Sequence, residues 1–122
     1  MSKNKSKEIE AMVEVAVAGL QEKKGNNIVS IDLRNIGSAF ADFFVICHGS
    51  SNRQVDALAD SVEEEMRKVL GEKPKHREGG EAAEWVLLDY YNVVIHIFSE
   101  EKRKFYALEE LWGDGKIKQH EE

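Results

Sequence analysis

Five consecutive residues, Phe43 to Cys47, are apolar on both sides of the alternation that a β-strand imposes. A strand that is apolar at every position is typical of the centre of a sheet that is covered on two faces. The run ends at Gly49, and apolar residues then recur at helical spacing over 55–69. This buried strand, glycine turn and amphipathic helix predict an α/β fold, because the strand needs a packed layer on each side.

The remainder of the chain divides into short elements of both kinds. Apolar residues three and four apart indicate helices, strict alternation indicates half-buried strands, and glycine or asparagine pairs mark the breaks between them. A charged segment that contains proline and lysine fits an edge strand, since those residues protect sheet edges. In chain order, the pattern predicts a helix over 9–20, a strand over 28–33, the central strand and its helix, an edge strand over 74–78, a hairpin over 85–98 and a last helix from Ser99 to Gly113.

These elements fit one domain, since the chain has 122 residues. Helices interleave with strands around one core, so we expect a single α/β domain over 1–113, with a mixed sheet of about five strands and three helices. The last helix should bury Phe105, Leu108 and Trp112. The polar tail over 114–122 should be frayed.

Charge and cysteine content exclude several kinds of protein. The net charge of −6 argues against nucleic acid as the main partner, because such binders need a basic footprint. It is compatible with a basic protein partner, and equally with a simple gain in solubility. The single cysteine, Cys47, rules out an internal disulfide framework and suits a cytoplasmic location. No apolar run approaches the ~20 residues of a membrane span, and residues 1–5 lack the apolar core of a secretory signal.

The turn at 49–50 is the main argument for an enzyme. Nucleotidyltransferases hold a triphosphate at such a junction, because amides at a helix N-terminus favour an anion. They also need two or three carboxylates on neighbouring strands to hold divalent metals. Here the carboxylates over 56–63 fall on the predicted helix, and Asp89 stands alone on a strand. A turn with a capping box, in which Ser51 and Gln54 satisfy helix amides, is therefore favoured over a phosphate site.

Neither a nucleophile nor a metal site is indicated elsewhere. Cys47 and His48 are adjacent on a strand and point to opposite faces, so they do not form a nucleophile–base pair. The four histidines show no ligand spacing, and zinc prefers clustered ligands. We therefore expect neither metal nor cofactor.

The two faces of the hairpin differ in chemistry. A two-residue loop at Tyr91-Asn92 would pair Tyr90 with Val93, and the residues on that face are apolar enough to be core. Tyrosine resists the positive φ that this turn requires, and a slip of one residue would exchange the two faces. The other face has the mixture of aromatic and polar residues found in interface hot spots, unless a helix covers it. Its pairs are Trp85 with Phe98, Leu87 with His96, and Asp89 with Val94.

Several long blocks, in the same order, resemble the ribosomal silencing factor family, also called the Iojap-related family. The resemblance covers residues 6–113, and it implies a nucleotidyltransferase-like α/β fold without the catalytic carboxylates, and hence no enzymatic activity. The blocks are residues 42–47, 49–55, 84–90, 94–98 and 105–113.

The resemblance also implies a translation repressor. It implies binding to the large ribosomal subunit through that subunit's ribosomal protein fourteen, where a bound domain would sterically block joining of the small subunit. We expect the contact on and around the family's signature strand, although Tyr90 has the core-facing parity. The expected partner-binding residues are Trp85, Leu87, Asp89, Tyr90, His96 and Phe98.

Three further expectations accompany this hypothesis. A homodimer through the same exposed face is compatible with the pattern, because large apolar patches seldom stay bare. Neither a membrane nor a specific nucleic-acid sequence is an expected partner. The alternative function is a residual nucleotide-binding or nucleotidyltransferase-type enzyme that uses Gly49 and Ser50.

Overall fold

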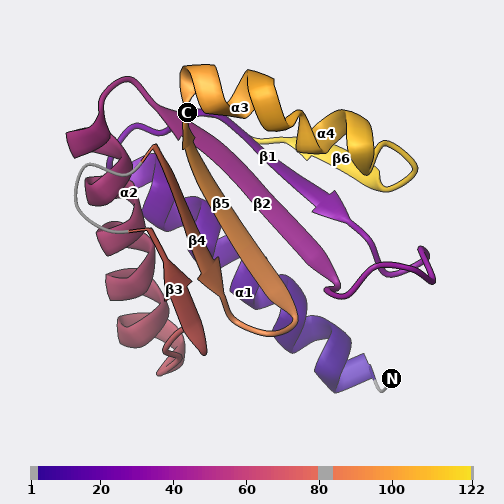
Figure 1. The fold of residues 1–122 in the computed structure, drawn as a ribbon. Helices are drawn as coiled ribbons and strands as arrows, with labels where there is room; N and C mark the ends of the chain where they lie inside the picture. The colour runs from indigo at the N-terminus through magenta and orange to yellow at the C-terminus, as the bar shows by residue number, and fades with distance from the viewer. Residues whose placement is uncertain (1–2, 80–83, 122) are drawn as a thin grey trace.

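The computed structural model describes residues 3–79 and 84–121 of the chain. A six-stranded sheet carries two long helices on one face and two short helices on the other (Figure 1). The elements are α1 Lys3–Glu22, β1 Asn26–Asp32, β2 Phe43–Gly49, α2 Asn52–Glu65, the π-helical segment η1 Met66–Leu70, β3 His76–Glu78, β4 Trp85–Asp89, β5 Val93–Ser99, α3 Glu100–Tyr106, α4 Leu108–Leu111 and β6 Lys116–Gln119.

The sheet is mixed, as the sequence predicts. Its strand order is β3-β4-β5-β2-β1-β6, in which β2 and β5 run parallel and every other neighbouring pair is antiparallel. The apolar run Phe43–Cys47 lies in β2, near the centre, and all five of its residues are buried. The prediction of an α/β fold around a covered central strand is therefore confirmed.

The sixth strand corrects the expectations of a five-stranded sheet and a frayed tail over 114–122. β6 pairs with the outer edge of β1, with Ile117 opposite Ile31, and the amide of His120 donates to the carbonyl of Ile28 at 2.8 Å. All four residues of β6 are exposed. Backbone hydrogen bonds rather than apolar burial hold this strand, so its sequence lacks the alternation by which strands are predicted.

The helix side of the sheet is a closed apolar core. Gly19 of α1 lies so close to α2 that a Cβ there would be 2.9 Å from the Cα of Val62. Each helix lays its apolar stripe on the sheet, as its periodicity predicts. The stripes consist of Ile9, Val13, Ala16, Val17 and Leu20 in α1, and of Val55, Leu58, Ala59, Val62 and Met66 in α2 and η1.

The end of the second helix departs from the predicted stripe. α2 continues into η1, and Gly71, at φ +67°, ends the helix, a position that favours glycine. Val69 was expected to be buried and is exposed. A π-helical turn holds more residues than an α-helical turn, so the residues after Met66 rotate away from the buried stripe.

The predicted last helix is two short helices. The helical segment begins at Ser99 as expected, with Ser99 as the cap of α3, but the backbone at Ala107 takes a left-handed conformation, with φ +47°, between α3 and α4. Leu108 and Trp112 pack against the sheet, whereas Phe105 is 75% exposed, contrary to the prediction. The helical pattern over 99–113 assumes an unbroken helix, and the break at Ala107 changes which side chains face the sheet.

The edge strand predicted over 74–78 is β3, which pairs with β4. Gly80, which we expected to break the chain before the hairpin, lies outside the described residues. None of the helices in the described part of the chain is long and apolar enough to cross a membrane.

Candidate partner-binding surface

The β4–β5 hairpin has the register that the sequence predicts. Trp85 lies opposite Phe98, Leu87 opposite His96 and Asp89 opposite Val94. Since neighbouring residues on a strand point to opposite faces, this register assigns the two predicted faces of the hairpin to the two sides of the sheet.

The hairpin tip shows how Tyr91 is accommodated. Its φ is +77°, a region that disfavours tyrosine. A carboxylate oxygen of Asp89 accepts the amide of Tyr91 at 2.8 Å, and the side chain of Asn92 donates to Asp42 at 2.8 Å. These two bonds hold a turn that Tyr91 disfavours, and the register does not slip. The Asp89 side chain is thus partly engaged in its own turn.

One face of the hairpin belongs to the helix-side core. Val86, Leu88, Ile95 and Ile97 are fully buried there, and Tyr90 is buried with them. Burial raises the pKa of the Tyr90 phenol, and the nearby carboxylates of Glu63 and Glu72 raise it further. Tyr90 therefore has the core-facing position that its parity predicts, and it does not line the surface.

The other face of the hairpin carries a continuous set of ring contacts. Trp85 lies 5.9 Å from Phe98 and 5.2 Å from Tyr106, which α3 contributes. His96 lies 6.1 Å from Trp85 and 4.8 Å from Phe44. At the ends of this set, Phe105 contacts Tyr106 and Phe40 contacts Phe44. The term "aromatic face" is used below for the solvent-accessible aromatic residues Phe40, Trp85, Phe105 and Tyr106, together with Leu87, which lies on the same face of β4 as Trp85.

The predicted contact residues divide by burial. Trp85, Leu87 and Asp89 are half-buried and accessible, whereas His96 and Phe98 are 5% and 1% exposed. Tyr106 lies 5.7 Å from the ring of Phe98. His96 and Phe98 therefore form the floor of the aromatic face, and a partner would meet the residues above them.

His96 is a neutral support for Trp85. The indole Nε1–H of Trp85 donates to Nδ1 of His96 at 3.4 Å, so the imidazole proton is on Nε2. Burial lowers the pKa of His96 to about 4. The buried Nε2 has no hydrogen-bond partner in the described structure. His96 therefore orients the indole from below and stays uncharged near neutral pH.

Sequence reasoning missed two members of this surface and placed a third in the core. Phe40 is 73% exposed in the loop between β1 and β2, Tyr106 is 41% exposed at the end of α3, and Phe105 was expected to be buried. Tyr106 stands in one of the blocks that carry the family resemblance. Phe40 has no sequence signal, because a loop residue lacks a periodic pattern that would show its direction.

The turn at 49–50 is occupied by the chain's own side chain. Both the amide and the hydroxyl of Ser50 donate to Oε1 of Gln54, at 2.6 and 2.8 Å, and the Gln54 amide donates to Ser51 Oγ at 3.1 Å. Nε2 of Gln54 donates in turn to the carbonyls of Lys23 and Lys24. The cap at Ser51 is as predicted, but the Gln54 side chain reaches Ser50 rather than the amide of Ser51. It occupies donors that a phosphate would need.

The chemistry of a catalytic or metal site is not assembled around this turn. Cys47 is fully buried in the helix-side core, whereas His48 faces α3 on the other side. Over residues 3–79 and 84–121, no group of three His, Cys, Asp or Glu side chains is placed to hold a metal ion. Of the candidate partner-binding residues, the structure brings Trp85 and Leu87 together on the aromatic face.

Comparisons with known proteins agree on one family. A family profile described as "Ribosomal silencing factor during starvation" matches residues 6–122. The ribosomal silencing factor of Halalkalibacterium halodurans is 42% identical over 106 residues, which cover 84% of this chain and 86% of that protein. The Bacillus subtilis factor is 37% identical, with 88% and 89% covered. A crystal structure of a Chromobacterium violaceum protein superimposes with a TM-score of 0.80 at 35% identity, covering 86% of each chain.

Proposed function

This chain belongs to the ribosomal silencing factor family, and on that premise we propose that it represses translation by binding the large ribosomal subunit and sterically blocking subunit joining. The partner on the subunit is ribosomal protein fourteen, at the surface that meets the small subunit. A domain docked there needs no catalytic group. It acts by occupying space. This agrees with a candidate site, the aromatic face, that is made of apolar and aromatic side chains.

The observation that carries this proposal is the aromatic face. Trp85, Leu87 and Tyr106 are accessible above a buried floor of His96 and Phe98, and Phe40 and Phe105 project at its ends. Large aromatic side chains over a packed base are the usual anchors of protein interfaces. An accessible surface of this kind is seldom left without a partner.

Charge supports a basic protein as the partner. The chain has a net charge of −6, and complementary charge speeds encounter and excludes wrong partners. Asp89 lies half-buried on the same face of β4 as Trp85 and Leu87. Asp89→Asn should weaken binding modestly and reduce its salt dependence, while its Oδ1 still accepts the amide of Tyr91.

The test is co-sedimentation of the purified chain with isolated large and small subunits. Trp85→Glu and Leu87→Glu should each reduce affinity for the large subunit by a factor on the order of ten or more, since each places a charge in the desolvated centre of the contact. Val69→Glu is the matched control, because Val69 is an exposed aliphatic residue of the helix layer. Unchanged affinity in both aromatic-face variants, with the fold intact by circular dichroism, would refute the placement of the contact.

Self-association would use the same surface. A second copy that covers the aromatic face would compete with the ribosomal protein, so dimer and ribosome complex should exclude each other. Sedimentation equilibrium of the wild type and of Leu87→Glu checks this, since the variant should be the more monomeric.

The rival function is a residual nucleotide-binding or nucleotidyltransferase-type enzyme that uses the turn at Gly49 and Ser50. The engagement of Gln54 with Ser50 weighs against it. Millimolar ATP with magnesium should leave the melting temperature unchanged, because a ligand that binds only the folded state must raise it. A clear rise would revive the enzyme hypothesis.

A further inference from the structure

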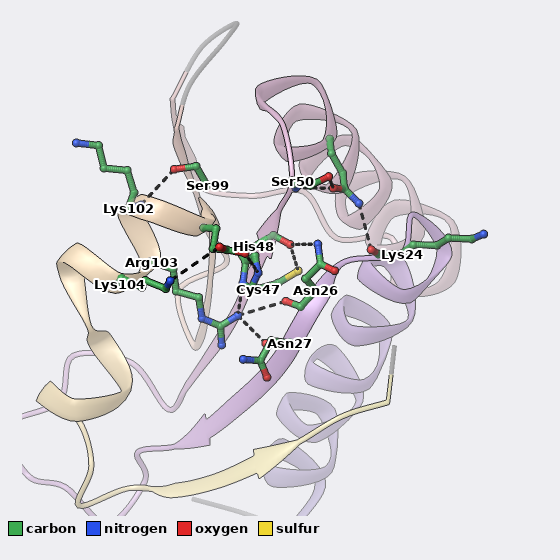
Figure 2. Close-up of polar contacts among 12 residues, drawn as sticks. Lys24, Asn26, Asn27, Cys47, His48, Ser50, Ser99, Lys102, Arg103 and Lys104 are labelled. Atoms are coloured by element: carbon green, nitrogen blue, oxygen red, sulfur yellow. Dashed lines mark hydrogen bonds and ion pairs between the residues drawn. The ribbon is translucent and has the colours of Figure 1, made fainter.

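A buried guanidinium anchors α3 to the sheet. Arg103 is 6% exposed, and it is the one buried residue of the seven in α3. Its Nη1 donates to the carbonyls of Asn26 and Asn27, at 3.2 and 2.6 Å, and to Nδ1 of His48 at 3.0 Å (Figure 2). Its Nη2 pairs with Glu109 of α4 at 3.1 Å. One side chain therefore ties both short helices to β1 and β2.

Such short helices depend on their anchors. Isolated helices of fewer than about 12 residues are marginal in water, so tertiary contacts must hold α3 in place. No residue of α4 is buried. α3 carries Tyr106, which covers Phe98 and contacts Trp85 on the aromatic face. The positions of Phe105 and Tyr106, the two members of the aromatic face on α3, therefore depend on the contacts of Arg103.

The hydrogen bond between Arg103 and His48 requires a neutral imidazole. A guanidinium has donors and no acceptor, so Nδ1 of His48 must accept and the proton must sit on Nε2. Nε2 lies 3.6 Å from a carboxylate oxygen of Glu100. A second proton, on Nδ1, would point at Nη1 of Arg103 and set two positive charges 3.0 Å apart.

Opposing charges also surround His48. The polar and charged groups that line its cavity of about 230 Å³ are Glu100, Arg103 and Lys104 on α3, Glu109 and Glu110 on α4, and the uncharged Asn27 on β1. The nearest carboxylate that would favour protonation, that of Glu100, is 67% exposed, so solvent screens it. The carboxylate of Glu109 is already paired with Arg103. Of these groups, the buried guanidinium lies closest to the imidazole, at 3.0 Å.

We propose that the Arg103–His48 hydrogen bond is a pH-sensitive latch, which holds α3 in its docked position near neutral pH and releases it when His48 takes up a proton. Free imidazoles take up a proton near pH 6.5, within the range that cells reach. Release would uncover Phe98 and displace Tyr106, so the aromatic face would lose part of its contact surface. This consequence for binding rests on the proposed function, whereas the latch itself does not.

The direct test measures the opening of α3 in the free chain. Hydrogen exchange of the α3 amides, corrected for intrinsic rates, should report opening that increases about tenfold relative to α2 between about pH 8 and about pH 5.5. His48→Asn places an amide oxygen where Nδ1 accepts and cannot be protonated, so its α3 should stay closed at both pH values. His48→Phe removes the acceptor and should open α3 at every pH. Identical pH profiles for the wild type and His48→Asn would overturn the latch.

Two control variants separate the effect of His48 from those of His76 and His120. His76→Asn and His120→Asn should keep the wild-type pH profile, since His76 pairs with Glu78 on the exposed β3 and His120 contacts Ser30 beside β6. A nitrogen-15 spectrum of the imidazoles needs no variant and should show His48 as the neutral Nε2–H tautomer at pH 7.5. A neutral Nδ1–H tautomer there would overturn the inference even if the variants failed to fold.

Binding separates this inference from the proposed function. Co-sedimentation with large subunits should weaken more for the wild type than for His48→Asn between pH 7.5 and pH 6, and the variant corrects for titration of the ribosome. Failure of the wild type to bind at pH 7.5 would contradict the proposed function and leave the exchange result standing. Binding that weakens equally in both proteins would contradict the link from the latch to the aromatic face.

Discussion

The helix side and the aromatic side of the sheet use the same strands and differ in what covers them. On the helix side, α1 and α2 lay long apolar stripes on the sheet and leave the core closed. On the aromatic side, α3 and α4 are short, one buried arginine anchors α3, and Trp85 and Leu87 stay half-accessible. Strand composition alone therefore does not decide which side is core. Helix length and anchoring decide which side stays available to a partner.

The largest expected effect comes from two adjacent leucines that point to opposite sides. Leu88 is fully buried on the helix side, and Leu88→Ala should lower the free energy of unfolding by about 2–5 kcal/mol. Leu87 is half-buried on the aromatic side, and Leu87→Ala should cost about 1 kcal/mol. Urea denaturation measures both. Leu87→Ala should also weaken ribosome binding, whereas folded Leu88→Ala should not. Equal losses of stability would break the comparison of the two sides.

A second effect, of intermediate size, concerns the buried floor of the aromatic face. Burial lowers the pKa of His96 to about 4, below the ordinary value near 6.5, so the unfolded chain takes up a proton first as the pH falls. The stability that neutral His96 contributes is therefore fully present above about pH 6.5, and it is lost as the pH falls from about 6.5 to about 4. Once the pH is below about 4, the free energy of unfolding is lower by about 3 kcal/mol.

His96→Phe should remove this dependence. Its unfolding free energy, measured by urea at a series of pH values, should decline less than that of the wild type over the same range. A parallel decline in both proteins would show that His96 is not buried as described. The latch at His48 is separable from this effect, because it predicts local opening of α3 near neutral pH rather than global unfolding in acid.

The smallest effect compares the two helix caps. Ser51 accepts the amide of Gln54 at the start of α2, and Ser99 accepts that of Lys102 at the start of α3. Ser51→Ala should lower global stability by about 1 kcal/mol, because α2 is part of the closed core. Ser99→Ala should change global stability less and instead speed hydrogen exchange in α3. Equal global losses, with unchanged exchange in α3, would mean that the aromatic side is as firmly built as the helix side.

The parts of the fold that sequence predicts are those that periodicity controls. The central strand at 43–47, the stripes of α1 and α2 and the hairpin register follow from the spacing of apolar residues. β6 does not follow, since it is held by backbone bonds and exposes every side chain. The break at Ala107 also does not follow, because alanine at a positive φ gives no signal in the sequence.

Only part of the candidate surface could be predicted from the sequence, for a related reason. Alternation in the hairpin identifies Trp85, Leu87 and Asp89 and shows that Tyr90 faces the core. It does not show which long-range neighbours cover His96 and Phe98, since Tyr106 comes from another element and Arg103 positions it. Depth of burial on one face depends on packing between elements, which local patterns do not contain.

The most direct test of the proposed steric block is a subunit-joining assay in which light scattering monitors the joining of the two subunits. Large subunits are incubated with a saturating amount of the chain, and small subunits are then added. Wild-type chain and Val69→Glu should both suppress joining in proportion to the fraction of large subunits that they occupy, whereas Trp85→Glu should leave joining at its uninhibited level. Normal joining by large subunits that demonstrably carry the wild-type chain would contradict a steric block.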